Sequence, residues 1–213
     1  MIKAVIFDFD GVIVESVDIK TKAFARLFQN EGDEVIRQVV DHHLKNCGVS
    51  RFEKFKYIYQ KILNRKLSDW KFKDLCGSFS ALVTEEVVKA PYVKGAKEFL
   101  DTFSSRYQCF VVSGTPQNEV VKIVEARKMT GYFVKIYGAP KEKRDIVNGI
   151  LIDYKLSKDE VVVIGDSLSD YEGALSNGVA FIARISGNEK LFSDKKCIKI
   201  KDLEGLQAQI CRL

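Results

Sequence analysis

Five short apolar runs constrain the fold of this chain more than any other feature of its sequence. They are rich in Val, Ile and Phe, and most of them lack the alternation of apolar and polar residues that marks a half-buried strand. The runs are AVIF (4–7), CFVV (109–112), FVKIY (133–137), VVVI (161–164) and VAFIA (179–183). Such runs are typical of parallel strands that helices cover on both faces of a sheet.

Helical segments separate the last four runs. Thr115 and Pro116 have the residue types of an N-cap and a first helical position, so they predict a helix from there onward. Ser169 and Glu172 are spaced as a capping box for a later helix. Strands and helices that alternate in this way predict a doubly wound α/β domain with a parallel sheet. The tail KCIKIKDLEGLQAQI adds a last short strand and a closing helix.

The segment between the first two runs interrupts this alternation. From residue 16 to residue 88 the sequence shows helical spacing and no strand pattern. We therefore predict two domains, an α/β core formed by residues 1–15 and 89–213 and a helical domain formed by residues 16–88.

Composition excludes several classes of protein. A net charge of +5 from 34 basic and 29 acidic residues is too small to indicate nucleic-acid binding, but it suits a small anionic substrate. The five cysteines are scattered and never form C-x-x-C, which argues against a disulfide framework or a zinc site. No run of 18 apolar residues and no signal-peptide pattern occurs, so we expect a cytoplasmic protein without membrane contact. Nothing in the sequence indicates the oligomeric state.

Polar residues follow four of the apolar runs directly. The continuations are DFDGV, SGTP, GAPKEK and GDSLSD. Ligands of open parallel sheets bind outside the carboxyl ends of the strands, so these residues are predicted to meet at one edge. They include Asp8, Asp10, Ser113, Asp166 and Asp170, together with Lys141, Lys143 or both. Converging carboxylates require a cation, and ligation by oxygen alone favours Mg²⁺. A hydroxyl, a lysine and backbone amides beside it would bind a phosphate.

The motif around Asp8 and Asp10 has a simpler interpretation when it is taken alone. Asp and Gly are common in turns, so D-x-D-G by itself more often marks a turn than a catalytic site. The coincidence of polar residues at four strand ends makes the catalytic interpretation much stronger than any single motif does.

These motifs together resemble those of the haloacid dehalogenase superfamily, in the branch of phosphatases and phosphomutases that carries a helical cap. The family pattern D-x-D-G-[VT] matches residues 8–12, its Ser/Thr motif matches Ser113, and G-D-x-x-x-D matches residues 165–170. The predicted helical segment is placed as the cap of that family, and the resemblance covers nearly the whole chain.

The resemblance implies a mechanism. Asp8 would attack phosphorus to give an aspartyl-phosphate, and Asp10 would protonate the leaving oxygen and then accept a proton from the hydrolytic water. Mg²⁺ would be bound by Asp8, by the backbone carbonyl of Asp10 and by Asp166. Ser113 and a lysine would neutralise the phosphoryl oxygens, assisted by the amides of Phe9 and Gly114. The substrate would be a small phosphorylated metabolite.

Two of these assignments have alternatives. Asp170 supports the metal site in the family, but it is also placed to be an acid in the first turn of a helix. For the phosphate lysine, the form G-x-P-x-x-K favours Lys143, whereas alignment on K-P-x-P-D favours Lys141. We prefer Lys143.

The predicted cap contributes two candidate substrate residues. Lys20 stands where close mutase relatives have a histidine, which puts mutase chemistry in doubt but still suits an anionic substrate. GVSR (48–51) resembles the specificity loop of the mutase branch, so Arg51 is a candidate for binding a second phosphate or a carboxylate.

Three functions follow from these patterns. The leading hypothesis is a Mg²⁺-dependent phosphatase, and the second is a phosphomutase that works through a bisphosphate. The third is a phosphate-sensing module without catalysis, against which the retention of both Asp8 and Asp10 argues.

Overall fold

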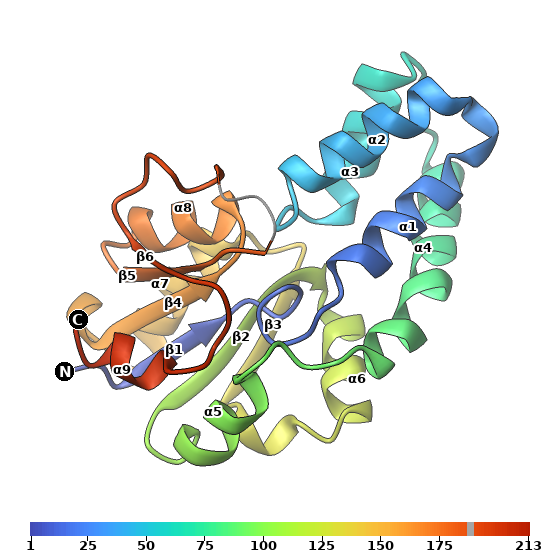
Figure 1. Cartoon of the computed structure of the whole chain (residues 1–213). Coiled ribbons are helices and arrows are strands. Elements are labelled where there is room, and N and C mark those ends of the chain that lie inside the picture. The colour runs from blue at the N-terminus through green and yellow to red at the C-terminus, as the bar shows by residue number, and fades with distance from the viewer. Residues whose placement is uncertain (187–189) are drawn as a thin grey trace.

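The computed structural model describes residues 1–186 and 190–213. Six parallel strands form one sheet in the order β3-β2-β1-β4-β5-β6 (Figure 1). Their bounds are β1 (Ala4–Phe7), β2 (Gln108–Pro116), β3 (Lys135–Ala139), β4 (Val161–Gly165), β5 (Ala180–Arg184) and β6 (Ile198–Ile200). The predicted parallel α/β fold is confirmed, and each of the five apolar runs lies wholly or partly in one of these strands.

Helices cover both faces of the sheet, which explains why the strands are apolar on both sides. On one face, alternate strand residues such as Val5 and Phe7 pack in a core with α5 (Ala96–Phe103), α6 (Gln117–Ala126) and α9 (Leu206–Ile210). On the other face, Ala4 and Ile6 pack in a second core with α7 (Lys143–Asp153) and α8 (Leu168–Ser176). Strand β1 is buried throughout its length.

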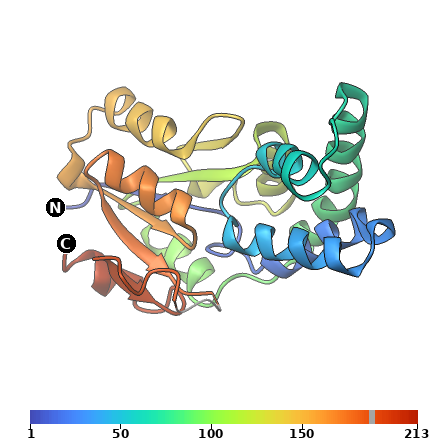
Figure 2. The ribbon, with the colours of Figure 1, turned by 90° about the horizontal axis from the view of Figure 1, so that it is seen from above.

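Four longer helices occupy the segment between β1 and α5. They are α1 (Val17–Leu27), α2 (Asp33–Lys45), α3 (Arg51–Tyr57) and α4 (Asp69–Lys89), and we call them the cap helices. They lie beyond one end of the sheet, whereas both termini lie at the opposite end (Figures 1 and 2). The two connections to the core pair with each other, since the amide of Glu15 donates to the carbonyl of Pro91 at 2.9 Å. The division into two domains at residues 15/16 and 88/89 stays a prediction.

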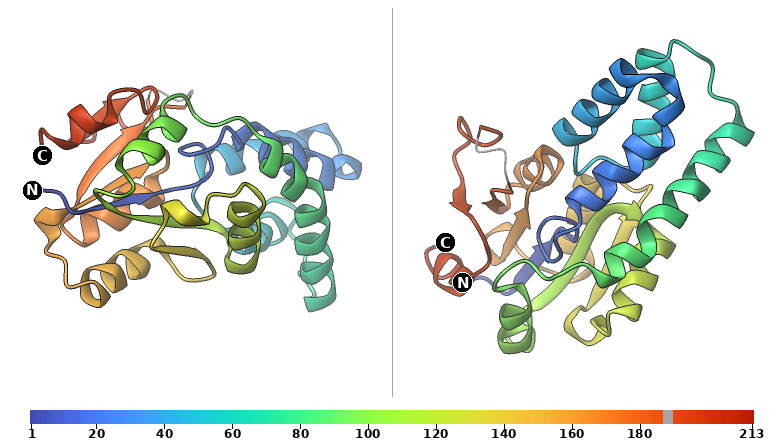
Figure 3. Two further views of the ribbon diagram at one scale, coloured as in Figure 1. Left: turned by 90° about the horizontal axis from the view of Figure 1, so that it is seen from below. Right: turned by 45° about the vertical axis from the view of Figure 1, so that its right-hand side comes forward.

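The cap helices pack around a cluster of aromatic rings. Phe24 of α1 lies 4.6 Å from Phe79 of α4 and 5.6 Å from Phe55 of α3, measured between ring centroids. Helix α4 also runs beside α6 of the core, as the right-hand view of Figure 3 shows. The cap helices therefore have an apolar core of their own and a second contact with the core through α6.

Two predicted helix starts are wrong. Helix α8 begins at Leu168, and its capping box is formed by Ser167 and Asp170 instead of Ser169 and Glu172, because the Asp170 carboxylate accepts from both the amide and the hydroxyl of Ser167. Helix α6 begins at Gln117, with Pro116 as its N-cap. The side chain of Thr115 does not cap this helix, because it is bound elsewhere. Among the helices of the described residues, none has the combination of length and apolar character that crossing a bilayer requires.

Candidate active site

Asp8 and Asp10 follow β1 at the centre of the sheet, where its carboxyl end meets the cap helices. The chain then turns at Gly11, which has a φ of +74°. A Cβ atom at this position would lie 2.1 Å from an Asp166 carboxylate oxygen. The glycine is required both for its backbone conformation and for the space that Asp166 occupies.

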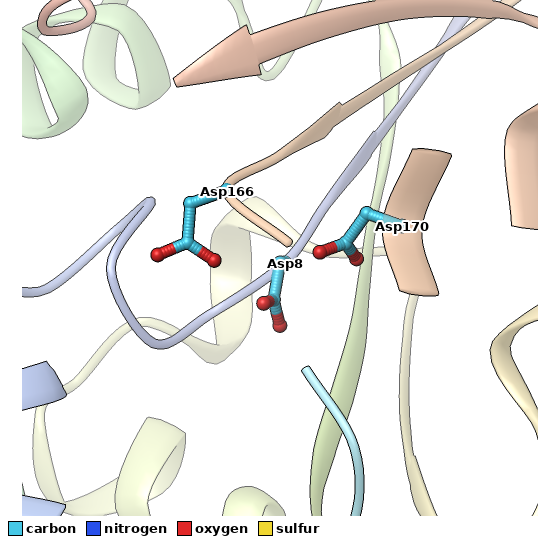
Figure 4. Close-up of side chains that lie close together, drawn as sticks. All are labelled: Asp8, Asp166 and Asp170. Carbon is cyan, nitrogen blue, oxygen red and sulfur yellow. The ribbon is translucent and has the colours of Figure 1, made fainter. Parts of the chain in front are cut away.

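Three buried carboxylates meet at this end of the sheet (Figure 4). Asp8, Asp166 and Asp170 each offer an oxygen that lies within 4.8 Å of the other two. Burial raises the pKa of Asp8 well above its usual range and raises that of Asp166 to about 7, and the neighbouring carboxylates add to both shifts. One oxygen of Asp166, Oδ1, is buried without a hydrogen-bond partner among the described residues. An unpaired buried carboxylate oxygen beside other carboxylates has the donor chemistry of a site for a hard cation.

Lys143 is the lysine that the structure brings to this cluster. Its Nζ lies 2.6 Å from Asp170 Oδ1 and 3.1 Å from Asp8 Oδ2. Burial by itself lowers the pKa of Lys143, but Asp170 and Asp8 outweigh that effect and raise the pKa above its usual value. Lys141 is exposed to solvent two residues earlier. The geometry therefore agrees with our preference for Lys143 over Lys141.

Asp170 combines the two roles that the sequence left open. One carboxylate oxygen binds Lys143, and the other accepts from the Ser167 hydroxyl at 2.5 Å within the first turn of α8. It is thus a helix-capping acid and a member of the acidic cluster at once. Both of its oxygens are bound, and through one of them Asp170 orients Lys143 toward Asp8.

Asp10 lies in a different environment from Asp8. Its carboxylate accepts hydrogen bonds from Ser16 at 2.6 Å and from Thr115 at 3.0 Å, and its Oδ2 lies 2.5 Å from the Lys20 ammonium. Burial by itself would raise the pKa of Asp10, but these donors together lower it to about 2. The two motif aspartates therefore lie in different surroundings, Asp8 among carboxylates and Asp10 among donors that keep it ionised.

The remaining predicted core residues lie around these two aspartates. The Ser113 hydroxyl lies 3.4 Å from Asp10 Oδ2, and the Phe9 amide donates to Asp8 Oδ1 at 2.7 Å. A Cβ atom on Gly114 would lie 2.7 Å from the carbonyl oxygen of Gly48, in the loop between α2 and α3. The cap helices therefore bring this loop directly onto the end of β2.

The two cap candidates occupy different surroundings. Lys20 of α1 reaches into the site, where its ammonium contacts Asp10 and donates to the Thr115 hydroxyl at 2.8 Å. Arg51 of α3 is buried, pairs with Glu119 of α6 through both carboxylate oxygens, and donates to Ser80 at 2.8 Å. It lines the same cavity as Asp10, but its charge is neutralised by a core residue. Its role toward substrate stays a prediction.

The sequence analysis missed three residues of this site. Thr115 was assigned to a helix cap, although its place two residues after Ser113 was a signal for the same strand end. His43 and Lys54 lie in the predicted cap segment, where the sequence pattern by itself indicates a packing or surface histidine and a solvated lysine. Both are buried and line the cavity with Asp8 and Asp10. No local pattern distinguishes them, because they are brought to the site by helix packing.

Comparisons with known proteins agree with this geometry. A family model described as haloacid dehalogenase-like hydrolase matches residues 5–184. A protein of Thermotoga maritima named phosphorylated carbohydrates phosphatase is 29% identical over 202 residues, which cover 92% of this chain and 89% of that protein.

Solved structures show the same fold. A predicted phosphoglycolate phosphatase from Haemophilus somnus has a TM-score of 0.79 at 18% identity and covers 98% of this chain, with 97% of its own length matched. A β-phosphoglucomutase from Clostridium difficile also has a TM-score of 0.79 at 18% identity, covering 100% of this chain and 98% of its own. With the family model matched over residues 5–184, the chain belongs to the haloacid dehalogenase-like hydrolases.

Proposed function

We propose that this protein is a Mg²⁺-dependent phosphatase that hydrolyses a small phosphorylated metabolite through an aspartyl-phosphate. The observation that carries the proposal is the convergence of Asp8, Asp166 and Lys143 at one end of the sheet, next to Asp10. Asp8 faces a cluster of carboxylates and Lys143, whereas Asp10 is held by Lys20, Ser16 and Thr115. The name of the Thermotoga maritima relative supports a phosphorylated carbohydrate as the class of substrate.

The acidic cluster has the donor set for the magnesium ion. Asp8 and Asp166 would bind the ion directly, with the backbone carbonyl of Asp10 as a third oxygen donor and Asp170 behind them. The unpaired Oδ1 of Asp166 supports this assignment, as do the burial and mutual repulsion that raise the pKa values of Asp8 and Asp166. When bound, the ion would offset the repulsion between the Asp8 carboxylate and the phosphate.

The residues of the site divide the reaction between them. A carboxylate oxygen of Asp8 forms a bond to phosphorus while the bond from phosphorus to the ester oxygen breaks. Lys20 keeps the Asp10 carboxylate ionised in this structure, so Asp10 must first exchange this contact for a proton. It then transfers that proton to the leaving oxygen, and the alcohol departs. In the second step Asp10 takes a proton from water, the water oxygen bonds to phosphorus, and Asp8 is released with inorganic phosphate.

Three groups would hold the phosphoryl oxygens during both steps. Lys143 is the cation next to Asp8, and the Ser113 hydroxyl and the Gly114 amide lie at the end of β2 on the same side of the sheet. The Phe9 amide donates to Asp8 in this structure and would turn to the phosphate only after Asp8 moves. Donors that are already in place before the reaction stabilise its developing charge with little reorganisation.

The phosphatase is better supported than the phosphomutase. A mutase must bind the second phosphate of a bisphosphate in the cap, and Arg51 was the candidate for that contact. Its pairing with Glu119 leaves no net charge there for a second phosphate. Lys20 is likewise engaged with Asp10. A purely phosphate-sensing role does not explain why hydrogen bonds hold a second carboxylate, Asp10, beside Asp8.

The test is release of inorganic phosphate from a panel of phosphomonoesters, with and without Mg²⁺. The wild type should show metal-dependent release. In Asp8→Asn the rate of release should be more than about 1,000-fold lower, as is typical when a nucleophile is removed. Asp18→Asn, an exposed change in the first turn of α1, serves as the matched control. Activity in Asp8→Asn equal to that of the control would refute the mechanism.

A further inference from the structure

A small cavity separates the motif aspartates from the cap helices. Its volume is about 30 Å³, and its walls include Asp8 and Asp10 from the core and Lys20, His43, Arg51 and Lys54 from the cap helices. One water requires roughly 10–15 Å³ on this measure, so the cavity has room for about two to three heavy-atom centres.

Two of the three cations in this wall already have a carboxylate. Lys20 is paired with Asp10, and Arg51 is paired with Glu119. Lys54 differs from both of them. Its Nζ lies 2.9 Å from His43 Nδ1, 3.4 Å from the carbonyl of Cys47 and 5.5 Å from the centroid of the Phe24 ring, all of them uncharged groups. In the part of the chain that the structure describes, Lys54 forms no ion pair.

This ammonium is also well removed from solvent. Lys54 is only 2% exposed, and its burial lowers its pKa to about 7. An unpaired charge in such a place costs several kcal/mol. An apolar side chain in place of Lys54 would therefore not lower the stability of the fold. The Nε2 atom of His43, its main partner, is buried without a hydrogen-bond partner among the described residues. The wall thus presents a cation that has no carboxylate beside it and a polar atom that has no hydrogen bond.

The direction of the proposed reaction brings the leaving group to this wall. Lys143 and Ser113 hold the phosphoryl group, and Asp10 must lie next to the ester oxygen that it protonates. The atoms beyond that oxygen therefore enter the cavity that Asp10 shares with Lys54.

We propose that Lys54 is a specificity-determining residue that binds a second anionic group, a carboxylate or a phosphate, on the leaving alcohol of the substrate. His43 positions the ammonium by accepting one of its hydrogen bonds. This inference rests on the proposed function for the direction of the leaving group. The volume of the cavity in this structure favours a carboxylate, which is smaller than a phosphate.

The test compares two phosphomonoesters that differ in one group. Phosphoglycolate carries a carboxylate one carbon from the ester oxygen, and 2-hydroxyethyl phosphate carries a neutral hydroxymethyl group there. In Lys54→Met, the ratio of kcat/KM for phosphoglycolate to that for 2-hydroxyethyl phosphate should fall roughly 10- to 100-fold, mainly through KM, since a charged hydrogen bond contributes about 1.5–3 kcal/mol. Lys56→Met, an exposed change on the same helix, should leave the ratio unchanged.

A second pair, ethane-1,2-diol bisphosphate and 2-hydroxyethyl phosphate, tests a second phosphate in the same way. If Lys54→Met lowers the ratio of kcat/KM values more in this pair than in the first, the group that Lys54 binds is a phosphate. Stability provides an independent readout. The melting temperature of Lys54→Met at pH 7 should equal or exceed that of the wild type, whereas a structural role for Lys54 would lower it.

Binding separates this inference from the proposed function. Calorimetry with Asp8→Asn should detect phosphoglycolate more tightly than 2-hydroxyethyl phosphate, and Lys54→Met in that background should remove the difference. If this holds while no substrate is hydrolysed by the wild type, the inference stands and the phosphatase proposal fails. The inference would be overturned if Lys54→Met lowered kcat/KM equally for both members of each pair, or lowered it for neither.

Discussion

The two lysines of GAPKEK show how much a single residue position decides. Lys143 is buried between Asp8 and Asp170, whereas Lys141 is exposed. They have the same charge and lie two residues apart, so only their placement distinguishes them. They form a natural pair of variants.

We predict that Lys143→Met lowers kcat for phosphate release by about 10²–10³-fold, because a preorganised cation next to the transferring group is removed. Lys141→Met should stay within about 2-fold of the wild type, since solvent already screens its charge. Steady-state kinetics on one phosphomonoester at saturating Mg²⁺ would measure both. A larger effect in Lys141→Met would transfer the phosphate contact to that lysine.

Lys54 makes a further prediction about pH. The folded pKa of about 7 lies below the ordinary 10.5, so between these values the unfolded chain binds more protons than the folded one. The free energy of unfolding should therefore rise with pH from 7 to 10.5, by at most about 1.4 kcal/mol per pH unit. The titratable groups that influence the pKa of Lys54 are Cys47, Lys20, Asp10 and Lys143.

Urea unfolding of the wild type and of Lys54→Met across this range isolates the effect. The stability advantage of Lys54→Met should be largest near pH 7 and should vanish near pH 10.5. A difference that does not change with pH would mean that Lys54 is neutral throughout or fully hydrated.

At the scale of the elements, Arg127 joins the end of α6 to the end of α4. Its Nη1 donates to the carbonyls of Val87, Val88 and Ala90 at 3.0, 2.6 and 2.7 Å. Its guanidinium also lies 4.5 Å from the centroid of the Tyr92 ring. The last carbonyls of a helix have no partner within the helix, so a cation from another element stabilises them. This contact holds the place where the chain returns from the cap helices to the core.

We predict that Arg127→Met lowers the free energy of unfolding by about 1.5–3 kcal/mol, the usual contribution of hydrogen bonds to a charged group. Hydrogen exchange should accelerate in the last turn of α4 more than in β1. Lys122→Met, at an exposed position of α6, is the control. Uniform acceleration along the whole chain would argue against a local role.

At the scale of the whole molecule, the acidic cluster links metal binding to folding. Asp8, Asp166 and Asp170 come from β1, β4 and α8 or directly follow them, so the cluster exists only in the folded chain. Mutual repulsion opposes folding until a cation is present. A ligand that binds only the folded state stabilises it by mass action.

Mg²⁺ should therefore raise the melting temperature of the wild type, with a gain of about 2.7 kcal/mol in unfolding free energy when the ion is 100-fold above its dissociation constant. Asp166→Asn should lose this gain and be at least as stable as the wild type without metal. Asp159→Asn, an exposed change before β4, should keep it. A gain that persists in Asp166→Asn would place the ion elsewhere.

Much of this molecule follows from local sequence. Strand character depends on short apolar runs, and the polar residues that end parallel strands must meet at one edge because the strands are parallel. Asp8, Asp10, Ser113 and Asp166 could be predicted in this way, without any knowledge of distant contacts. The structure places Asp170 beside Asp8 and Asp166, with Ser167 as a capping partner that the sequence did not indicate.

The tertiary structure decided what local pattern cannot express. The pairing of Arg51 with Glu119 joins residues 68 positions apart, and the contact of Lys20 with Thr115 joins residues 95 apart. Both contacts depend on how the cap helices pack against the core. Helix periodicity predicts which face of a helix is buried, but it does not predict which side chains that face contacts. For the same reason Lys54 looked like part of a solvated face, and only the packing of α3 against α1 and α2 buried its charge.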